Sequence, residues 1–469
     1  MNRLTTILIA LATVGASACT TLAPDYLRPT APVPQSWPAS ATNGSGATVE
    51  DVDAVAWREF FADVRLQQVI EHALAHNRDL RVAALNIEQA RAQYRIQRAD
   101  RLPALDVDAS HNAQRVPGDL AAGGGSTVSR RYGVAIDVAG WELDFFGRLR
   151  SLRDAALEQY LASEEAHRSA HIALVAEVAT AWLQLAAERE RLALVERTLE
   201  TRRQALTLTQ ASFEAGVASA LELHQTQSEL ERARADTAAF TARVARSENA
   251  LALLTGAALP AELLPTRLDA TAARLAEPPA GLPADVLTRR PDITAAEHRL
   301  RAANANIGAA RAAFFPRITL TASAGTASAE LGGLFEGGSR TWSFLPQLTL
   351  PIFDAGRLAA SLDVAEVRRD IAVAEYERAI QGAFREVADA LADRATLGDE
   401  LDAQRRLTTA AQESRRLSEA RYRAGVDSFL GLLDAQRTLY AAEQELIATR
   451  LNEAANRVAL YKVLGGGWH

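Results

Sequence analysis

The sequence contains two copies of one unit, because four groups of residues recur in the same order roughly 210 residues further along the chain. The clearest is the segment 213–219, Phe-Glu-Ala-Gly-Val-Ala-Ser, which returns at 422–428 as Tyr-Arg-Ala-Gly-Val-Asp-Ser. The other recurring groups are Asp79 and Asp292, Pro103 and Pro316, and Gly147-Arg148 and Gly356-Arg357. Both copies are therefore predicted to form the same succession of helices and strands. The predicted domain boundaries are a first copy at residues 57–256, a linker at 257–283 and a second copy at 284–469.

Each copy is predicted to run helix, strand, strand, long helix, turn, long helix. The boundaries come from helix-stopping proline and glycine residues and from the change of apolar spacing between helical and strand segments. The predicted helices cover residues 63–100, 148–213, 218–254, 285–313, 357–423 and 428–464, and the predicted strands cover 104–115, 130–145, 316–328 and 341–353.

The long helices carry apolar residues at seven-residue spacing, which predicts helices packed side by side over a long distance. The residues on this seam are Val175, Val178, Trp182, Leu185, Leu192 and Leu199 in the first copy, and Leu432, Leu439, Leu446 and Leu460, with Ala435 and Ala442 between them, in the second. A helix of ~65 residues reaches ~100 Å, more than a globular domain of this size needs. The pattern therefore predicts a mainly α-helical wall of long antiparallel hairpins.

The strands alternate apolar and polar residues, as in Ile318 and Leu320 against Thr319 and Thr321. At about ten residues each, they have the length of a tilted membrane strand. Four strands cannot close a barrel, and an open edge in lipid leaves backbone groups unpaired. If these strands enter a membrane, two, three or four chains must pool eight, twelve or sixteen of them around a polar interior. Two ordinary surface hairpins are the alternative.

The first residues have the pattern of a bacterial export signal. A basic residue and an apolar stretch too short to span a bilayer predict a signal peptide at residues 1–18. Cys19, the only cysteine, follows small residues and is predicted to carry a covalent lipid, although Ala16 replaces the usual large aliphatic residue of such sites. The alternative is an unmodified thiol beside an ordinary cleavage site. The proline-rich residues 19–56 are predicted to be an extended tether that does not pack by itself.

Composition excludes several function classes. The net charge of -7 is spread over mixed-sign runs, so no nucleic-acid partner is expected. The pairs His72/His76 and His167/His171 have a spacing that could share a metal ion, but neither has the glutamate of a zinc-protease helix. The sequence has no phosphate-binding loop, nucleophile motif or cysteine cluster. We therefore expect no enzyme activity, no metal site and no cofactor besides the lipid on Cys19.

A set of motifs spread over nearly the whole chain resembles the outer membrane factor family, the TolC-type ducts, and within it the NodT-like lipoprotein branch. The motifs are Trp57, Phe60-Phe61, Asn77-Arg-Asp-Leu80, Ala90-Arg91, Arg289-Arg-Pro-Asp-Ile293, Pro351-Ile-Phe-Asp-Ala-Gly-Arg357 and Leu432-Leu-Asp-Ala-Gln-Arg437. The resemblance implies a homotrimer with a twelve-strand barrel in the cell outer membrane and a twelve-helix tunnel through the periplasm. It also implies a passive exit channel for small toxic compounds, docked to a periplasmic adaptor and an inner-membrane transporter of the RND type.

The helix turns of the two copies are predicted to lie at the far end from the strands. Glycine permits a tight reversal after a helix, and serine is suited to cap the next helix. The turn residues are Gly216, Val217 and Ser219 in the first copy and Gly425, Val426 and Ser428 in the second. The resemblance implies that these tips contact the adaptor; an ordinary helical turn is the alternative.

Just past its tip, the second copy departs from the first. Asp427, Leu430 and Asp434 are spaced three and four apart and so share one helical face. In a symmetric assembly each acid forms a ring of like charge, which at a constriction attracts cations. Since related ducts close at this helix, we interpret Leu430 as an apolar constriction and Asp434 as the main acidic ring, with Asp427 and Tyr422 as latch candidates. Solvated surface acids are the alternative.

Two other functions remain open at this point. One is a duct for type I protein secretion or for metal efflux, since the partner chooses the cargo of a passive channel. The other belongs to a different class, a periplasmic coiled-coil lipoprotein that never spans a membrane. The four alternating strands argue against the second.

Overall fold

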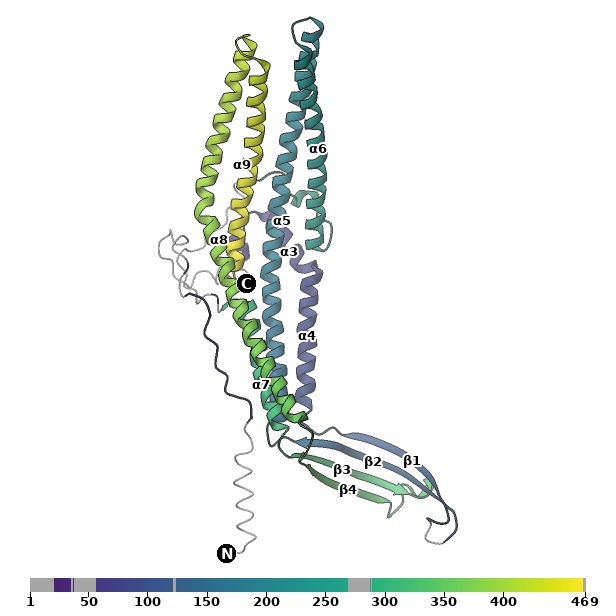
Figure 1. Cartoon of the computed structure of the whole chain (residues 1–469). Helices are drawn as coiled ribbons and strands as arrows, with labels where there is room; N and C mark the ends of the chain where they lie inside the picture. Colours follow the sequence, from purple (N-terminus) through teal and green to yellow (C-terminus); the bar gives the residue numbers. More distant parts are fainter. Residues whose placement is uncertain are drawn as a thin grey trace. The chain divides into compact units, whose positions relative to one another are not determined.

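The computed structural model describes residues 21–34, 37, 56–120, 124–268, 287 and 289–466 (Figure 1). The predicted signal peptide, Cys19 and most of the predicted tether lie outside these residues. Residues 269–283 of the predicted linker also lie outside them.

The chain forms two compact units, and each unit takes residues from both sequence copies. Unit 1 consists of Met1–Thr30, Asn86–Glu164 and Ala295–Tyr376. Unit 2 consists of Ala31–Leu85, Glu165–Thr294 and Glu377–His469. All four strands lie in unit 1, and both helical tips lie in unit 2.

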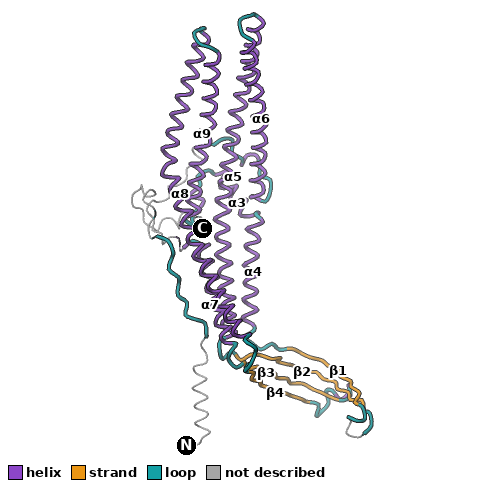
Figure 2. The backbone as a smooth tube through the Cα atoms, viewed as in Figure 1, coloured by secondary structure: helices purple, strands orange, loops and turns teal. Residues whose placement is uncertain are grey.

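In each half of the chain, helical structure is followed by two strands and then by two long helices, which is the predicted order (Figure 2). In the first half they are α2 (Trp57–Phe60), α3 (Val64–His76), α4 (Arg78–Ala99), β1 (Asp106–Val116), β2 (Thr127–Leu143), α5 (Arg148–Glu214), α6 (Ala220–Thr255) and the short helix η3 (Ala261–Leu263). In the second half they are α7 (Pro291–Ala312), β3 (Arg317–Ser328), the short helix η5 (Leu331–Gly333), β4 (Arg340–Thr349), α8 (Arg357–Arg423) and α9 (Phe429–Val463).

The prediction of one continuous helix over residues 63–100 is wrong, because α3 and α4 are separated at Asn77. The backbone of Asn77 is extended, with φ -60° and ψ 133°. Its side-chain oxygen accepts a hydrogen bond from the N–H of Leu80 at 2.8 Å, which caps α4. Its side-chain nitrogen donates to the carbonyl of Leu254 at 2.8 Å. A contact with a residue far along the chain therefore fixes the break.

Three smaller corrections concern the ends of elements. Helix α7 begins at Pro291 rather than at residue 285, which suits proline at the first helical position. Strand β4 ends at Thr349 rather than at 353, just before Pro351, which has no N–H to donate to a neighbouring strand. The short helix α2 was not predicted.

The strands form one antiparallel sheet in the order β1-β2-β3-β4. The register of β2 against β3 shifts between Val138 and Trp141, where Gly140 has a φ of 61° and permits the bulge. Large apolar side chains are exposed along the sheet, at Val107, Val128, Ile136, Trp342, Phe344 and Leu348. Within the described chain, the outer edges of β1 and β4 have no strand beside them.

The hydrophobic core of unit 2 forms where α2 and α3 pack against α5, α6 and α9. The ring of Phe60 stacks on that of Tyr461 with centroids 4.0 Å apart, and the indole nitrogen of Trp182 donates to the carbonyl of Leu263 at 3.1 Å. The predicted seam of α5 is buried from Val175 to Leu185. Beyond it the prediction fails, because Leu194 and Val195 are buried while the two predicted leucines, Leu192 and Leu199, are only half-buried.

The predicted seam of α9 is also buried at some of its residues and only half-buried at others. The predicted residues Leu432, Ala435, Ala442 and Leu460 are buried, whereas Leu439 and Leu446 are half-buried. Helix α5 also contains the one described helical stretch that is apolar enough to cross a membrane, and 61% of that stretch is buried within the protein. Burial of this kind is typical of a core helix.

Residues 21–30, the described start of the predicted tether, lie against helices of unit 1. The hydroxyls of Thr21 and Ser151 are 2.9 Å apart. The side-chain nitrogen of Asn304 donates to the carbonyl of Pro24 at 2.7 Å. These contacts hold the segment against α5 and α7 within unit 1.

Candidate functional site

The two helical tips have the same backbone structure. Gly216 and Gly425 both take the left-handed conformation, with φ of 75° and 71°. The N–H of Val217 donates to the carbonyl of Ser212 at 2.8 Å, and the N–H of Val426 donates to that of Arg421 at 3.0 Å. Each glycine N–H bonds back three residues as well, which completes a Schellman turn in both copies.

The serines that follow the turns cap the returning helices. The hydroxyl of Ser219 accepts a hydrogen bond from the N–H of Glu222 at 3.2 Å and thereby caps α6. The hydroxyl of Ser428 accepts one from the N–H of Gly431 at 3.4 Å and caps α9. The caps satisfy backbone N–H groups at the starts of α6 and α9 and leave the outer side chains of the tips exposed.

Each tip presents the same pair of apolar side chains to solvent. Val217 and Leu221 are 83% and 68% exposed in the first tip, and Val426 and Leu430 are 66% and 58% exposed in the second. These apolar residues lie at matched positions of the two turns, where a protein partner could bury them. A larger partner-facing patch would need several chains.

The second tip adds charge to this surface. Asp427 accepts hydrogen bonds from the Arg421 side chain at 3.1 Å and from the N–H of Ser428 at 2.9 Å. The bond from Arg421, followed by that from Ser428, holds the pKa of the Asp427 carboxyl below its usual value. Asp434 is exposed on α9, one helical turn beyond Leu430. Asp427 therefore stabilises its own turn, whereas Asp434 faces solvent.

Tyr422 connects the second helical hairpin, formed by α8 and α9, to the first, formed by α5 and α6. Its hydroxyl donates to Glu222 at 2.5 Å, so the tyrosine joins the end of α8 to the start of α6. Burial, followed by the neighbouring Glu222 carboxylate, raises the pKa of Tyr422 to about 12. The hydroxyl thus stays protonated and keeps donating throughout the physiological pH range. Tyr422 and Asp427, the two predicted latch residues, take different partners.

A second cross-hairpin contact lies deeper and was missed from the sequence. The guanidinium of Arg437 on α9 donates to Glu229 on α6 at 2.5 and 3.0 Å. The Glu229 side chain is only 6% exposed, and a second guanidinium, that of Arg202 on α5, lies 3.8 Å from its other oxygen. Burial lowers the pKa of Arg202. One buried carboxylate therefore holds cations from both hairpins.

A third contact between the two hairpins joins Tyr440 on α9 to Asp236 on α6. The tyrosine hydroxyl donates to the carboxylate at 3.1 Å, and burial, followed by Asp236, raises the pKa of Tyr440 to about 12. Beside it lies a cavity of about 230 Å³, lined by Val195, Thr198, Arg202, Glu229, Arg232, Ala233, Asp236, Arg437, Tyr440 and Ala441. The sequence gives one sign of these pairs. The two partners of each pair are separated by nearly the same number of residues as the two sequence copies.

The histidine pairs show no metal-binding arrangement. His72 and His76 stack with ring centroids 4.3 Å apart, and Nδ1 of His76 lies 2.9 Å from the carbonyl oxygen of His72. Burial lowers the pKa of both His167 and His171. Among the described residues, no group of three or more histidine, cysteine or acidic side chains could hold a metal ion.

Comparison with known proteins identifies the family. The family model "Outer membrane efflux protein" matches residues 69–257 and 282–466. The chain is 50% identical over 451 residues to the probable efflux pump outer membrane protein TtgC of Pseudomonas putida, covering 96% of this chain and 93% of that one. It is 49% identical over 462 residues to the outer membrane protein OprJ of Pseudomonas aeruginosa, covering 98% and 95%.

Solved structures agree with the sequence comparison. A crystal structure of a membrane protein from Pseudomonas aeruginosa superposes with a TM-score of 0.89 at 49% identity, covering 95% of this chain and 100% of that one. The open state of the MtrE outer membrane channel of Neisseria gonorrhoeae superposes with a TM-score of 0.85 at 39% identity, covering 96% and 99%. The resemblance of the motifs to the outer membrane factor family is thereby confirmed. The chain belongs to the outer membrane efflux protein family and is a protein of the cell outer membrane.

Proposed function

We propose that the protein is the passive exit channel of a tripartite efflux pump and assembles as a homotrimer. Each chain contributes four strands to one twelve-strand barrel and its long helices to one tunnel, so that the two sequence copies act as equivalent wall segments. A periplasmic adaptor binds the helical tips, and an inner-membrane transporter of the RND type supplies the cargo. The duct has no enzymatic step and no cofactor besides a lipid on Cys19.

The observation that carries this proposal is the open sheet. Four antiparallel strands expose large apolar side chains, and the outer edges of β1 and β4 are unpaired in the described chain. A sheet with two free edges is unstable in hydrocarbon, where each unpaired backbone group costs several kcal/mol. Pairing β1 of one copy with β4 of the next removes every edge.

Names of the relatives support small organic cargo. Relatives about half identical to this chain are named toluene, solvent and antibiotic efflux pump outer membrane proteins. None of these three names refers to protein secretion or metal efflux, the two alternative functions. Membership of an outer membrane efflux family also argues against a lipoprotein that never enters the membrane.

The assembly is tested by mass and conductance. Native mass spectrometry of the detergent-purified protein is expected to give the mass of three chains, because three copies close the barrel. Planar-bilayer recording of the same sample is expected to show discrete channels. Particles of a single chain without conductance would contradict both the trimer and the duct.

We further propose that the second tip forms the periplasmic gate. In a trimer the exposed Leu430 and Asp434 side chains of three α9 helices face a common axis, Leu430 as an apolar constriction and Asp434 as an acidic ring. The contacts of Tyr422 with Glu222 and of Arg437 with Glu229 hold α8 and α9 against the first hairpin. Opening requires these contacts to separate.

Asp434→Asn is expected to lower the preference of the channel for cations over anions by roughly two- to fivefold, because it removes three charges from one ring. The measurement is the reversal potential in a salt gradient, at low ionic strength where screening is weak. Glu231→Gln is the control, since this exposed acid on α6 pairs with Arg234 on the same helix. An unchanged reversal potential for Asp434→Asn would remove Asp434 from the ring.

A further inference from the structure

Helix α7 carries four residues on one face that all meet the N-terminal segment 21–30. Their spacing of four, three and four residues places them along a single helical stripe. The four residues are Glu297, Arg301, Asn304 and Gly308. The stripe and the segment belong to unit 1.

The far end of the stripe fits the backbone of the segment closely. A Cβ added to Gly308 would lie 2.6 Å from the amide nitrogen of Ala23 and 2.7 Å from the hydroxyl of Ser151. Only glycine leaves room for this approach. One turn earlier, Asn304 donates to the carbonyl of Pro24 at 2.7 Å. The segment therefore runs antiparallel to α7 along the stripe.

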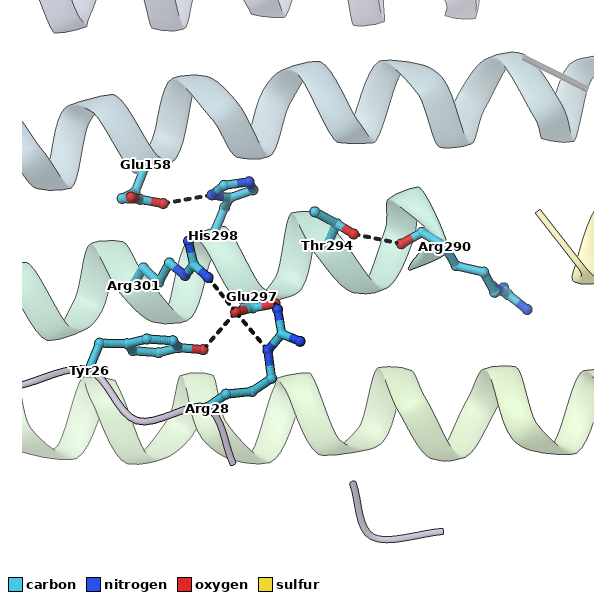
Figure 3. A network of polar contacts seen from close by, with 8 residues as sticks. All are labelled: Tyr26, Arg28, Glu158, Arg290, Thr294, Glu297, His298 and Arg301. Carbon is cyan, nitrogen blue, oxygen red and sulfur yellow. Dashed lines mark hydrogen bonds and ion pairs between the residues drawn. The ribbon is translucent and has the colours of Figure 1, made fainter. Parts of the chain in front are cut away.

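The stripe begins at Glu297, whose carboxylate is buried. Two side chains of the segment donate hydrogen bonds to this carboxylate (Figure 3). The Tyr26 hydroxyl donates to it at 3.1 Å, and the guanidinium of Arg28 donates to both of its oxygens, at 3.1 and 2.8 Å. Tyr26 and Arg28 are two residues apart in an extended chain and so point the same way. Leu27 between them is 83% exposed.

The segment supplies part of the stabilisation of the Glu297 carboxylate. The Glu297 side chain is 6% exposed, and Arg301 donates to it at 2.7 Å from its own helix. The Arg301 guanidinium also lies 5.0 Å from the centre of the Tyr26 ring. Burial alone would raise the pKa of Glu297, but the bonds from Arg28 and then Arg301 outweigh it and lower the pKa. Without the segment, this buried carboxylate would lose two of its three donors.

Nearby groups on other helices do not replace these donors. Tyr376 on α8 is buried beside the cluster, with a pKa raised by burial and then by Glu297. His298, the next residue of α7, turns to Glu158 on α5, with its Nδ1 2.6 Å from that carboxylate (Figure 3). The Glu158–His298 pair is thus a neighbouring contact of similar chemistry in which the segment takes no part.

We infer that α7 is a receptor for the chain's own N-terminal segment, which it recognises as an extended Tyr-X-Arg strap, with Glu297 as the positioning residue. The strap holds the N-terminal end of the described chain at the first turn of α5, where Thr21 meets Ser151. Force applied to that end passes directly into α5 and α7. All of these contacts lie within unit 1, whereas both helical tips lie in unit 2.

Limited proteolysis with chymotrypsin tests the strap, because the Tyr26–Leu27 bond is cut only when Tyr26 leaves Glu297. Cleavage at this bond in the full-length protein is expected to rise by roughly tenfold or more in Glu297→Gln and in Arg28→Gln, since cleavage follows the open population. Glu158→Gln is the matched control and is expected to stay within about twofold of the parent. Arg28 is about half exposed on the strap, so its variant keeps the body folded.

Gly308→Ala separates strap release from general destabilisation. Alanine is the better helix former, which offsets the cost of turning the Ser151 hydroxyl aside, while the added Cβ displaces the backbone of Ala23. Faster cleavage at Tyr26–Leu27 with an unchanged or higher melting temperature is the expected result. Parent-like cleavage in both Arg28→Gln and Gly308→Ala would overturn the inference, as would equal acceleration in Glu158→Gln.

Discussion

Glu229→Gln is expected to open the channel, because it leaves the guanidiniums of Arg202 and Arg437 in the hairpin interface without their shared carboxylate. Removing one partner of a fully buried pair costs ~3–5 kcal/mol. Arg437 is 45% exposed, and water takes over part of that loss, so we expect about 1–2 kcal/mol per chain. A bias of about 1.4 kcal/mol shifts a two-state equilibrium tenfold.

The measurement is the open probability in planar bilayers at fixed voltage, with a rise of about tenfold or more expected, since each of the three chains of the proposed trimer adds its own bias. Glu231→Gln, two residues along the same helix, is the matched control, because its partner Arg234 lies on the surface of α6. Arg437→Gln added to Glu229→Gln is expected to recover part of the closure, since it removes one uncompensated cation. A variant that stays as closed as the parent would show that this contact does not hold the gate.

Gly325→Ala is expected to abolish assembly of the barrel. Gly325 lies in β3 opposite Ala135 in β2, and an added Cβ would lie 2.1 Å from the carbonyl oxygen of Val134 and 2.5 Å from the Cα of Ala135. Neither of these backbone atoms can move without separating the two strands. We expect a cost of about 3 kcal/mol or more, from overpacking and from backbone groups unpaired in lipid.

The loss is read as the fraction of chain that runs as a folded oligomer on unheated denaturing gels of outer membranes. Gly337→Ala is the control, because Gly337 lies in the connection between β3 and β4 with nothing within 4 Å of an added Cβ. It is expected to leave the oligomer intact. Normal oligomer levels in Gly325→Ala would mean that β2 and β3 do not pair closely at this position.

The sequence predicted the long helices well because their signals are local. Helix α8 occupies the predicted residues 357–423, and α5 ends one residue later than predicted. Seven-residue spacing and the stop at a glycine are properties of neighbouring residues, so no distant contact is needed to read them. The alternation of the strands is local in the same way.

The candidate site was predicted less completely. The tip residues were found because they repeat, but Glu229 and Arg202 looked like ordinary charged residues of a helix face. Their importance comes from burial, and burial depends on the second hairpin, which lies about 200 residues away in the sequence. The partners of the strap were missed for the same reason. Its prolines indicated an extended segment, while its partners lie on α7, about 270 residues further along.

The sequence by itself determined the recurring turn motifs, the length of the helices, the alternation of the strands and the family. Each of these rests on patterns within a short window, or on the comparison of one window with another. The tertiary structure alone decided where α3 gives way to α4, which acids are buried and where the N-terminal segment docks. A hydrogen bond such as that from Asn77 to Leu254 exists only once both helices have packed, so no local pattern could reveal it.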